Sequence, residues 1–375
     1  MRPTHVEVDL GRIAENLEAI RRHVGQAKLM PVLKANAYGH GLVEVARHLA
    51  RSGVDYLGVG MLEEGILLRE QGIRQPILVL GGIMENQIPY FLQFDLTLTA
   101  SSVGKLQQID EAAAAAGGRA RVHLKIDTGM ERLGVHHYNA EAFLETSLRC
   151  RHSDIEGIYS HFASSESADL SAACLQLERF QEVLDFYRRR SLQPPWRHLA
   201  NSGAILQLPQ SHFDMVRPGL LLYGVYPSRE ALRSIVVRPA LTWKSRVVYF
   251  KVVRAGSPVS YGWTWKSDHM VRVVTVPVGY GDGYFRALSN KGVVLIRGRR
   301  YPVVGSVCMD QVAVNLEWDS AYNGDEVILI GAAGAESITC EEVAERAGTI
   351  PYEVLTNINT RVPRLYVGRG EITGL

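Results

Sequence analysis

Lys28-Leu29-Met30-Pro31-Val32-Leu33 is a short apolar run, and Leu42-Val43-Glu44-Val45-Ala46-Arg47-His48-Leu49-Ala50-Arg51 follows it with apolar residues at helical spacing. The two segments predict one β-strand and one α-helix. Similar pairs recur from Gly11 to about Gly224. This alternation indicates a parallel sheet, because two parallel strands need a long crossover between them.

Eight candidate strands in this part of the chain predict a (β/α)8 barrel, with a doubly wound open sheet as the alternative. The expected strands are Lys28–Leu33, Tyr56–Val59, Ile77–Leu80, Leu96–Thr99, Val122–Ile126, Ile155–Ser160, Arg197–Leu199 and Met215–Val216. The expected helices include Arg12–Val24, Leu42–Arg51, Leu62–Gln71, Ile109–Ala116 and Leu175–Arg190.

The pattern changes after about Ser228, where runs rich in Val, Ile and aromatic residues are separated by Gly-rich turns. These runs are Ala240–Val253, Met270–Val278, Gly292–Val304 and Glu326–Ile330, and short helices at Cys340–Arg346 and Pro351–Asn357 precede a strand at Arg364–Val367. They predict a mainly antiparallel β domain. Because single cores stop growing beyond ~250–300 residues, we expect two domains, residues 1–230 and 231–375.

The balance of charge gives no reason to expect a highly charged partner. Lys and Arg total 41 against 39 Asp and Glu, a formal net charge of +2, so nucleic acid is not expected as a partner. No apolar run approaches the ~18–20 residues that span a bilayer, and the N-terminus lacks a signal-peptide pattern, so we expect a cytoplasmic protein without a membrane partner. The four cysteines have neither disulfide-framework nor metal-ligand spacing, and no metal is expected.

Polar residues follow five of the apolar runs, at the strand ends where barrels of this type carry their chemistry. They are Lys34, Lys125 with Asp127 and Arg132, His161, Asn201-Ser202-Gly203, and Arg217-Pro218-Gly219. One such lysine is usually a solvated strand edge, and one such histidine is usually structural. Polar residues at five strand ends on one rim are harder to explain as solvated or structural side chains. They predict a functional site.

These motifs stand in an order that resembles the alanine racemase family over nearly the whole chain. They are the Lys34 motif, Lys-Ile-Asp-Thr-Gly-Met-Glu-Arg-Leu-Gly at 125–134, Asn201-Ser202-Gly203, Arg217-Pro218-Gly219, Ser260-Tyr261-Gly262, Gly279-Tyr280, Val307-Cys308-Met309-Asp310 and Pro351-Tyr352-Glu353. The resemblance implies a barrel followed by a β domain, pyridoxal 5'-phosphate as cofactor, and a head-to-tail homodimer. It also implies interconversion of L- and D-alanine, which supplies D-alanine for peptidoglycan.

Racemisation of an amino acid needs an electron sink and a proton-transfer group on each face of the α-carbon. Pyridoxal phosphate supplies the sink through a covalent link to a lysine. The resemblance implies that Lys34 is this lysine and serves the face of the D-isomer, with Lys125 as the competing candidate. Tyr261 of the other subunit would serve the opposite face, although a tyrosine needs a lowered pKa to act as a base at neutral pH.

The family's cofactor contacts can be placed on this sequence. The phosphate group would be lined by Tyr38, Ser202, Gly219, Leu220 and Tyr352, of which Tyr352 is also explained as an ordinary helix start. Asn201 would be a further cofactor-binding residue. Arg217 would face the ring nitrogen, with His161 beside the ring holding Arg217. A guanidinium donates hydrogen bonds but cannot accept one, and it rarely gives up a proton, so this arrangement favours returning the proton to the α-carbon over transamination. A salt bridge that ties the end of the barrel together is the alternative role of Arg217.

The resemblance also implies contacts to the substrate. Arg132 and Met309 would lie near its carboxylate, and Tyr280 would stand at the entrance of the site. Lys125 is a candidate for carbamylation by CO2, which would turn it into an anion that orients Arg132. Trp263 and Trp265, which follow the tyrosine motif, either narrow this entrance or pack in the domain.

Three other functions stay open at this point. A racemase for serine or for a broader set of amino acids fits the same residues. Pyridoxal-phosphate-binding proteins without known catalysis share the barrel but lack a β domain. Amino-acid decarboxylases have a β domain, but an acidic residue usually meets their ring nitrogen, where Arg217 stands here.

Overall fold

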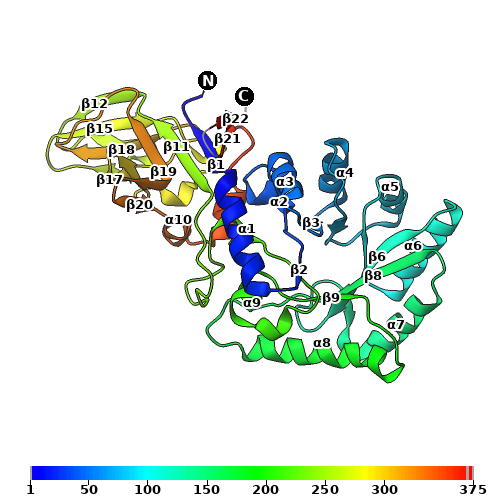
Figure 1. The fold of residues 1–375 in the computed structure, drawn as a ribbon. Coiled ribbons are helices and arrows are strands. Elements are labelled where there is room, and N and C mark those ends of the chain that lie inside the picture. The colour runs from blue at the N-terminus through cyan, green and yellow to red at the C-terminus, as the bar shows by residue number, and fades with distance from the viewer. Residues whose placement is uncertain (1, 369–370, 374–375) are drawn as a thin grey trace. The chain divides into compact units, whose positions relative to one another are not determined.

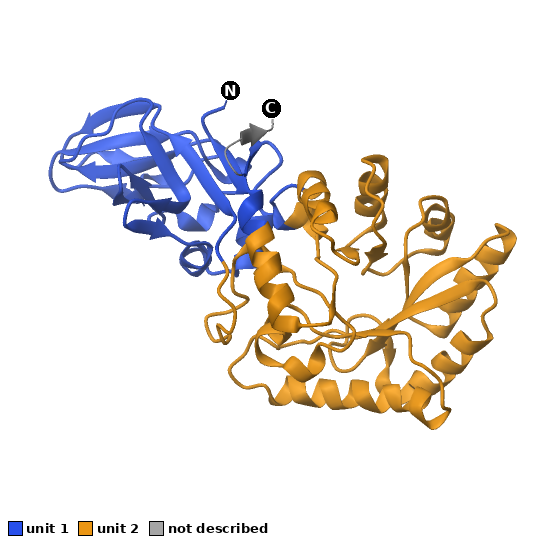
Figure 2. Cartoon of the chain, viewed as in Figure 1, with its two compact units in different colours: residues 1–13, 38–41, 238–375 blue, residues 14–37, 42–237 orange. Residues whose placement is uncertain are grey.

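The computed structural model describes residues 2–368 and 371–373, and the chain forms two compact units (Figure 2). One unit comprises residues 14–37 and 42–237, and the other comprises residues 1–13, 38–41 and 238–375. From the sequence we expect residues 1–230 in one domain, whereas in the structure residues 2–13 group with the C-terminal part. The reason is that β1 (His5–Asp9) pairs with β11 (Leu241–Arg246) and β21 (Arg364–Gly368). The outer ends of the two predicted domains, Met1 and Leu375, lie outside the described residues.

The unit of residues 14–37 and 42–237 is a (β/α)8 barrel, which confirms the predicted fold (Figure 1). Within the described residues, one sheet has the order β2-β10-β9-β8-β6-β5, β3 pairs with β4, and parallel bridges Val32–Gly58 and Leu78–Thr97 close the ring. The barrel strands are β2 (Lys28–Leu29), β3 (Leu57–Val59), β4 (Ile77–Val79), β5 (Leu98–Ala100), β6 (Ala120–Asp127), β8 (Ser153–Tyr159), β9 (Trp196–His198) and β10 (Met215–Val216).

The helices of this unit alternate with the strands and lie around them (Figure 1). They are α3 (Leu42–Arg51), α4 (Leu62–Glu70), α5 (Ile88–Gln93), α6 (Val103–Ala115), α7 (Ala140–Arg149), α8 (Ser171–Arg189) and α9 (Ser202–Gln207), together with most of α1 (Leu10–Val24). Helix α6 begins six residues before the predicted Ile109, because the Ser102 side chain caps it by accepting the Lys105 N–H at 3.1 Å.

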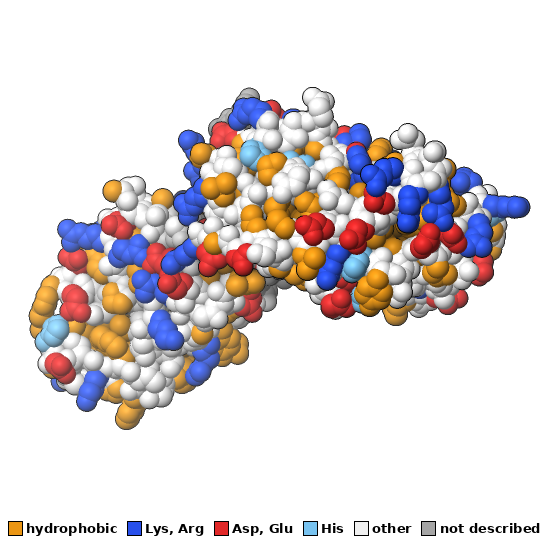
Figure 3. Space-filling model, turned by 90° about the horizontal axis from the view of Figure 1, so that it is seen from below, with side chains coloured by type: hydrophobic (Ala, Val, Ile, Leu, Met, Phe, Trp, Pro, Cys, Tyr) orange, Lys and Arg blue, Asp and Glu red, His pale blue; other side chains and the backbone are white. Residues whose placement is uncertain are grey.

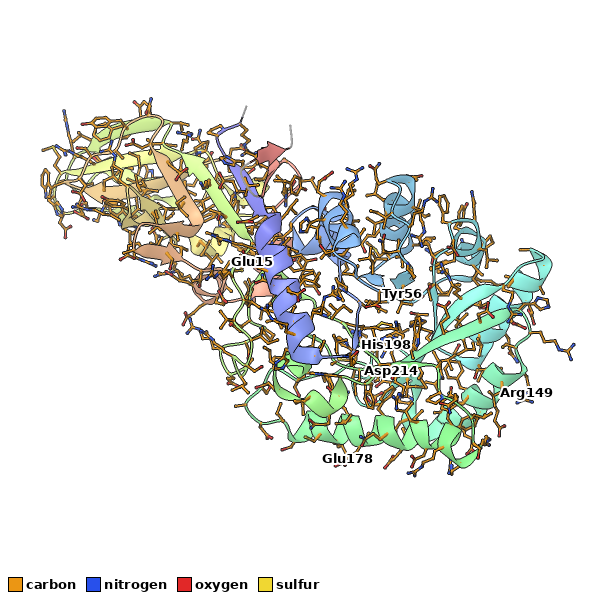
Figure 4. All side chains as sticks on the ribbon, viewed as in Figure 1. Glu15, Tyr56, Arg149, Glu178, His198 and Asp214 are labelled. Atoms are coloured by element: carbon orange, nitrogen blue, oxygen red, sulfur yellow. The ribbon has the colours of Figure 1, made fainter. Side chains whose placement is uncertain are left out.

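The inside of the barrel is more polar than the Val, Ile and Leu layers usual in this fold. His123 and His198 are completely buried there, beside a cluster formed by Met30, Tyr56, Leu78, Tyr159 and Met215. Figure 4 shows Tyr56 and His198 among the strands, whereas Arg149 and Glu178 lie on the outer helices. Buried imidazoles need hydrogen-bond partners. His123 is paired with His198, and His198 is paired with Arg217, which follows β10.

The other unit is built on one sheet with the strand order β12-β15-β18-β17-β16-β19-β11-β1-β21-β22. Its remaining strands are β12 (Tyr249–Val253), β13 (Pro258–Val259), β14 (Trp265–Lys266), β15 (Val271–Val276), β16 (Val293–Ile296), β17 (Arg299–Val304), β18 (Val312–Glu317), β19 (Glu326–Ala333), β20 (Glu336–Ile338) and β22 (Glu371–Thr373). Nearly all of its pairs are antiparallel, as predicted. Two short helices, α10 (Cys340–Ala347) and α11 (Pro351–Thr356), lie close to their predicted positions.

Two of the predicted runs in this unit are divided in the structure. The run 240–253 becomes β11 and β12, which are consecutive in the chain but lie at distant positions in the strand order. Only two residues join these strands, so the sheet must curve round on itself. The run 292–304 becomes the hairpin β16–β17, which turns at Arg297 and Gly298 with φ of 53° and 73°, the backbone that tight hairpins favour.

Figure 3 shows basic and acidic side chains interspersed on one face of the molecule, without a large region of one sign. This distribution agrees with the small net charge of +2. Among the described residues, no helix combines the length and the apolar character needed to cross a membrane.

Candidate active site at the mouth of the barrel

Lys34 follows the first barrel strand and precedes a turn of unusual backbone. The next four residues, Ala35–Tyr38, have φ of 54°, 56°, 53° and 52°, a left-handed region that costs about 1–2 kcal/mol for each residue with a side chain. Glu64 in the first turn of α4 stabilises the start of this turn. One of its carboxylate oxygens accepts the Ala35 N–H at 2.7 Å and the other accepts the Gly60 N–H at 2.7 Å. Strained backbone that is held in this way is typical of functional sites.

The surroundings of the Lys34 amine favour its uncharged form. Burial lowers the pKa of Lys34, and the guanidiniums of Arg132 and Arg217 lower it further, while the carboxylate of Glu64 opposes them. The residue still presents accessible surface at the strand end. A lysine with a lowered pKa offers more of the nucleophilic free amine at neutral pH.

Lys125 lies on β6, two residues before the end of this strand, and is only 5 % exposed. Burial and the charge of Arg217 lower its pKa to about 7, with Asp127 opposing. Its amine donates to the Ile126 carbonyl at 3.2 Å and lies 4.9 Å from the centre of the Tyr159 ring. Lys125 is therefore also largely uncharged above neutral pH, but it is less accessible than Lys34.

The segment that carries Arg132 folds around the carboxylate of Asp127. One Asp127 oxygen accepts the N–H groups of Gly129 and Met130 at 2.8 and 2.9 Å, and the other accepts the Arg132 N–H at 3.1 Å. Burial of the carboxyl raises its pKa, but the N–H groups of Gly129, Glu131 and Arg132 outweigh burial and hold the pKa of Asp127 below its usual value. Asp127 thus fixes the backbone of Arg132, while the Arg132 side chain is exposed.

Arg217 is only 3 % exposed, and its hydrogen bonds go to neutral acceptors. It donates to the carbonyls of Ser160 and Leu199 at 2.7 and 3.1 Å, to His198 Nδ1 at 2.9 Å and to His161 Nδ1 at 3.3 Å. The His161 ring thus contacts Arg217 directly. Burial lowers the pKa of Arg217 to about 10, so the guanidinium stays charged at neutral pH without an acidic partner among the hydrogen bonds described.

The contacts of Arg217 determine how two buried histidines carry their protons. A guanidinium can only donate, so His198 Nδ1 accepts, and the proton of neutral His198 is on Nε2. His198 Nε2 lies 2.8 Å from His123 Nδ1, and it therefore donates to His123. Burial, followed by the charge of Arg217, holds the pKa of His198 well below its usual value and lowers that of His123 to about 3. His198 and His123 are therefore neutral, and Arg217 donates to His198 while the guanidinium keeps its own charge.

Ser202 joins the segments that follow the last two barrel strands. It is buried at the start of α9, and its hydroxyl oxygen accepts the N–H groups of Gly219 and Leu221 at 3.0 and 3.3 Å. Asn201 caps the same helix through the Ala204 N–H at 3.1 Å. Leu220, between these two amides, is fully buried. The hydroxyl and amide groups predicted to line a phosphate group therefore lie together.

The remaining predicted site residues lie in the unit that contains residues 38–41 and 238–375. Tyr38 and Tyr352 are neighbours, with ring centres 6.1 Å apart. Tyr261, Tyr280 and Met309 have exposed side chains, and that of Tyr261 is 73 % exposed. Two tryptophans flank Thr264 differently: Trp265 packs against the cluster of Val253, Val271 and Val273, whereas Trp263 is exposed.

A buried carboxylate connects the segments that carry Tyr280 and Met309. Asp282 is completely buried and forms ion pairs with Arg2 at 2.6 Å and with Arg361 at 2.9 Å. Arg361 also pairs with Asp310, next to Met309, and the Gly281 N–H donates to the Met309 carbonyl at 2.9 Å. The two segments are therefore fixed to one another by charge and by backbone.

Several residues that support the site were missed in the sequence. Glu64, His198 and Asp282 were not singled out, although each holds a predicted residue or its backbone in place. A partial signal exists for two of them, since Glu64 is in the first helical turn after a strand end and His198 occupies an inward position on β9. Nothing in the sequence near Asp282 indicates Arg2 and Arg361 as its partners.

The fold and the site together define a class of protein: a (β/α)8 barrel with a β domain, whose barrel mouth holds two lysines of lowered pKa together with the guanidiniums of Arg132 and Arg217. Residues 8–227 match the family model of the alanine racemase N-terminal domain, and residues 240–366 match that of the alanine racemase C-terminal domain.

Individual alanine racemases are also similar to this chain in sequence and in structure. The alanine racemase of Carboxydothermus hydrogenoformans is 46% identical over 369 residues, which cover 98% of this chain and 100% of the relative. The solved structure of the alanine racemase of Clostridium difficile 630 superposes with a TM-score of 0.94 at 36% identity, covering 100% of this chain and 98% of that chain. The alanine racemase of Bartonella henselae, solved with covalently bound pyridoxal phosphate, gives a TM-score of 0.89 at 28% identity and covers 98% of this chain and 100% of that chain. The chain belongs to the alanine racemase family.

Proposed function

We propose that this chain interconverts L-alanine and D-alanine with the help of pyridoxal phosphate. The observation that carries the proposal is the reactive amine of Lys34 at the barrel mouth beside Arg132 and Arg217, in a chain of the alanine racemase family. The covalently bound pyridoxal phosphate of the Bartonella henselae relative supports the choice of cofactor.

The residues at the barrel mouth fit this cofactor. Lys34 has the lowered pKa that a covalent link to an aldehyde requires. The Ser202 hydroxyl oxygen accepts the N–H groups of Gly219 and Leu221, and its own O–H can donate to a phosphate group. Arg217 is a buried charge whose hydrogen bonds go to neutral groups, as suits a residue facing the ring nitrogen. The other proposed cofactor contacts are Tyr38, His161, Asn201, Gly219, Leu220 and Tyr352.

Two residues would move the proton at the α-carbon. When bound, pyridoxal phosphate supplies the electron sink that lets an amino acid lose its α-proton. Lys34 would hold or return this proton on the face of the D-isomer, and Tyr261 would do so on the face of the L-isomer. Arg132 and Met309 would bind the substrate carboxylate, and Tyr280 would restrict the entrance to small amino acids.

Arg217 would decide what happens after the proton has left the substrate. Its guanidinium donates hydrogen bonds but does not readily give up a proton, and neutral His198 and His161 keep it in this state. The ring nitrogen opposite it would therefore stay unprotonated. A weaker electron sink favours rapid return of the proton to the α-carbon over transamination.

Arg217→Glu is expected to slow racemisation and to raise the fraction of turnovers that end in transamination. The carboxylate would hold a proton at the ring nitrogen and deepen the electron sink. Loss of one positioned hydrogen-bond donor costs on the order of 10²–10³-fold in rate. The ratio of pyruvate formed to alanine racemised measures the partition, and an unchanged ratio would contradict this role of Arg217.

Lys125 is proposed to carry a carbamate. The unprotonated amine adds to CO2 and releases one proton, and burial favours that amine by lowering the pKa of Lys125 to about 7. The resulting anion would lie near the guanidiniums of Arg132 and Arg217, whose charges lower this pKa in the unmodified chain. It would thereby orient Arg132 toward the substrate carboxylate.

The fraction of Lys125 that carries the carbamate is expected to rise with pH. Below the Lys125 pKa of about 7 the amine is protonated and cannot react with CO2, so the carbamate is lost as pH falls through this value. With 13C-labelled bicarbonate, a carbamate carbon signal should appear above this pH, disappear below it and be absent from Lys125→Ala. KM for alanine should rise as the signal is lost. A protein without the signal on the alkaline side of this pKa would show that Lys125 acts as a free amine.

A head-to-tail homodimer would bring the two halves of the site together. In this proposal the barrel of one subunit, with Lys34, receives Tyr261 from the β domain of its partner. The side chains of Tyr261, which is 73 % exposed, and of Trp263 are accessible for such an interface, and in a two-fold dimer both subunits would offer the same surface.

The direct test of the proposed function is an assay of purified enzyme against alanine, serine, lysine and glutamate. Racemisation of alanine, with serine as at most a slower substrate, is the expected result. A cytoplasmic role in supplying D-alanine for peptidoglycan is tested by expressing the chain in a bacterium that requires D-alanine. Growth without added D-alanine is expected from the wild type and not from Lys34→Ala. Faster racemisation of serine than of alanine would redefine the enzyme.

A further inference from the structure

The segment around Tyr261 has a strained backbone. Ser260, Gly262 and Trp263 have φ of 67°, 72° and 51°, and only the glycine adopts this region without steric cost. Within the described residues, the Tyr261 phenol forms no hydrogen bond, so its position depends on the backbone that carries it. Strain of this kind persists only where the surrounding structure holds it in place.

Two serines connect this segment to a second one by reciprocal hydrogen bonds. The Ser260 hydroxyl donates to the Ser306 carbonyl at 2.6 Å, and the Ser306 hydroxyl donates to the Tyr261 carbonyl at 2.8 Å. Ser306 is buried, whereas Tyr261 is largely exposed. The buried partner thus holds the carbonyl of the exposed residue directly.

The two segments also make very close backbone contact. A Cβ added to Gly305 would lie 2.6 Å from the Val259 carbonyl oxygen and 2.7 Å from Ser260 Cβ, so only glycine fits. Asn290 is hydrogen-bonded to both segments. Its amide oxygen accepts the Gly305 N–H at 2.6 Å, and its nitrogen donates to Thr264 Oγ1 at 3.1 Å. The Ser306 segment is therefore anchored independently of Tyr261.

From this geometry we infer that Ser306 is a positioning residue that fixes Tyr261 for proton transfer at the L face of the substrate. The inference rests on the proposed function, in which Tyr261 is the acid–base group on that face. Ser306 acts through the Tyr261 backbone carbonyl and does not itself touch the substrate. A displacement of about 1 Å in such a group lowers the rate on the order of 10²-fold.

The test is a pair of isotope-effect measurements on Ser306→Ala. Because the two alanine enantiomers are equally stable, a defect at Tyr261 lowers the forward and reverse rates together and cannot be assigned from rates alone. With α-deuterated L-alanine, the slower Tyr261 step breaks the labelled bond, so the primary isotope effect should rise. With α-deuterated D-alanine, Lys34 breaks the labelled bond, and the slower Tyr261 step follows it, so the isotope effect should fall.

Three further variants make this outcome specific. Ser306→Thr keeps the hydroxyl and should restore both isotope effects. Ser245→Ala is the matched control, since Ser245 is a buried serine of the same unit whose hydroxyl is hydrogen-bonded to Thr4 at 2.8 Å. It should leave both isotope effects at the wild-type values. If Ser306→Ala does not fold, Ser260→Ala removes the other of the two reciprocal bonds and should give the same opposite changes.

Folded Ser306→Ala, or Ser260→Ala in its place, with both isotope effects unchanged would overturn the inference. Tyr261→Phe separates this failure from a failure of the proposed function. If Tyr261→Phe racemises alanine at the wild-type rate, the assignment of Tyr261 as the acid–base group is wrong. If Tyr261→Phe is inactive while the serine variants keep wild-type isotope effects, only the positioning role of Ser306 is lost.

Discussion

Mixing Lys34→Ala chains with Tyr261→Ala chains is expected to restore about a quarter of the wild-type racemase activity, although each variant alone is nearly inactive. In the proposed dimer each site takes Lys34 from one subunit and Tyr261 from the other. After unfolding and refolding at equal amounts, about half of the dimers are mixed, and each mixed dimer holds one intact site and one with both defects. The gain is large, because loss of one acid–base group costs ~10²–10⁴-fold.

A matched pair of variants shows whether the recovery has the proposed origin. Lys34 and Arg217 lie in the same unit of the chain, so a mixture of Lys34→Ala with Arg217→Ala leaves a defect in every site and should recover nothing. Differential tags on the two chains confirm that mixed dimers have formed. If tagged mixed dimers of Lys34→Ala and Tyr261→Ala stay inactive, both residues act within one chain and the shared site is wrong.

Lys34→Ala is expected to lose the covalent link to pyridoxal phosphate together with racemisation. The reason is that Lys34 combines a lowered pKa with accessible surface, whereas Lys125, with a pKa of about 7, is 5 % exposed and donates to a carbonyl. The expected fall in kcat is at least the ~10²–10⁴-fold that loss of one acid–base group costs. Borohydride reduction followed by peptide mapping should place the cofactor label on Lys34 in the wild type.

Lys125→Ala is the control for this experiment. It removes the competing amine, and the label should stay on Lys34 with the cofactor retained on dialysis. In Lys34→Ala the cofactor should be lost on dialysis and no peptide should be labelled. A wild-type label on the peptide of Lys125 would reverse the assignment of the two lysines.

Much of the barrel could be predicted because local pattern and final structure agree there. The helix predicted at Leu42–Arg51 has those bounds in the structure, and the strand pair β3 and β4 lies within the predicted runs. Apolar runs that alternate with helical spacing leave few arrangements other than a parallel sheet. Where the predicted barrel elements differ from the structure, they do so at their ends, where a cap such as Ser102 decides the boundary, and the helices α5, α7 and α9 are not among the predicted ones.

The β domain was harder to predict because its pairings join distant segments. The pattern of β18, Val312–Glu317, was not singled out, although it lies in the middle of the sheet between β15 and β17. The first strand, His5–Asp9, was left outside the prediction, and only its pairing with β11 and β21 shows that it belongs to the β unit. A strand of five residues satisfies its backbone with any suitable edge, so its own sequence does not select a partner.

From the sequence alone, Lys34, Lys125, Arg217 and Ser202 could be placed at the barrel mouth, because the carboxyl ends of parallel strands share one rim of a barrel. The environment of these groups could be read only from the folded chain. The lowered pKa of Lys34, the proton positions along Arg217, His198 and His123, and the hold of Ser306 on Tyr261 all depend on burial and on hydrogen bonds between distant segments. Such contacts are set by packing in three dimensions, and apart from the inward position of His198 on β9 the residues that make them carry no signal in the sequence.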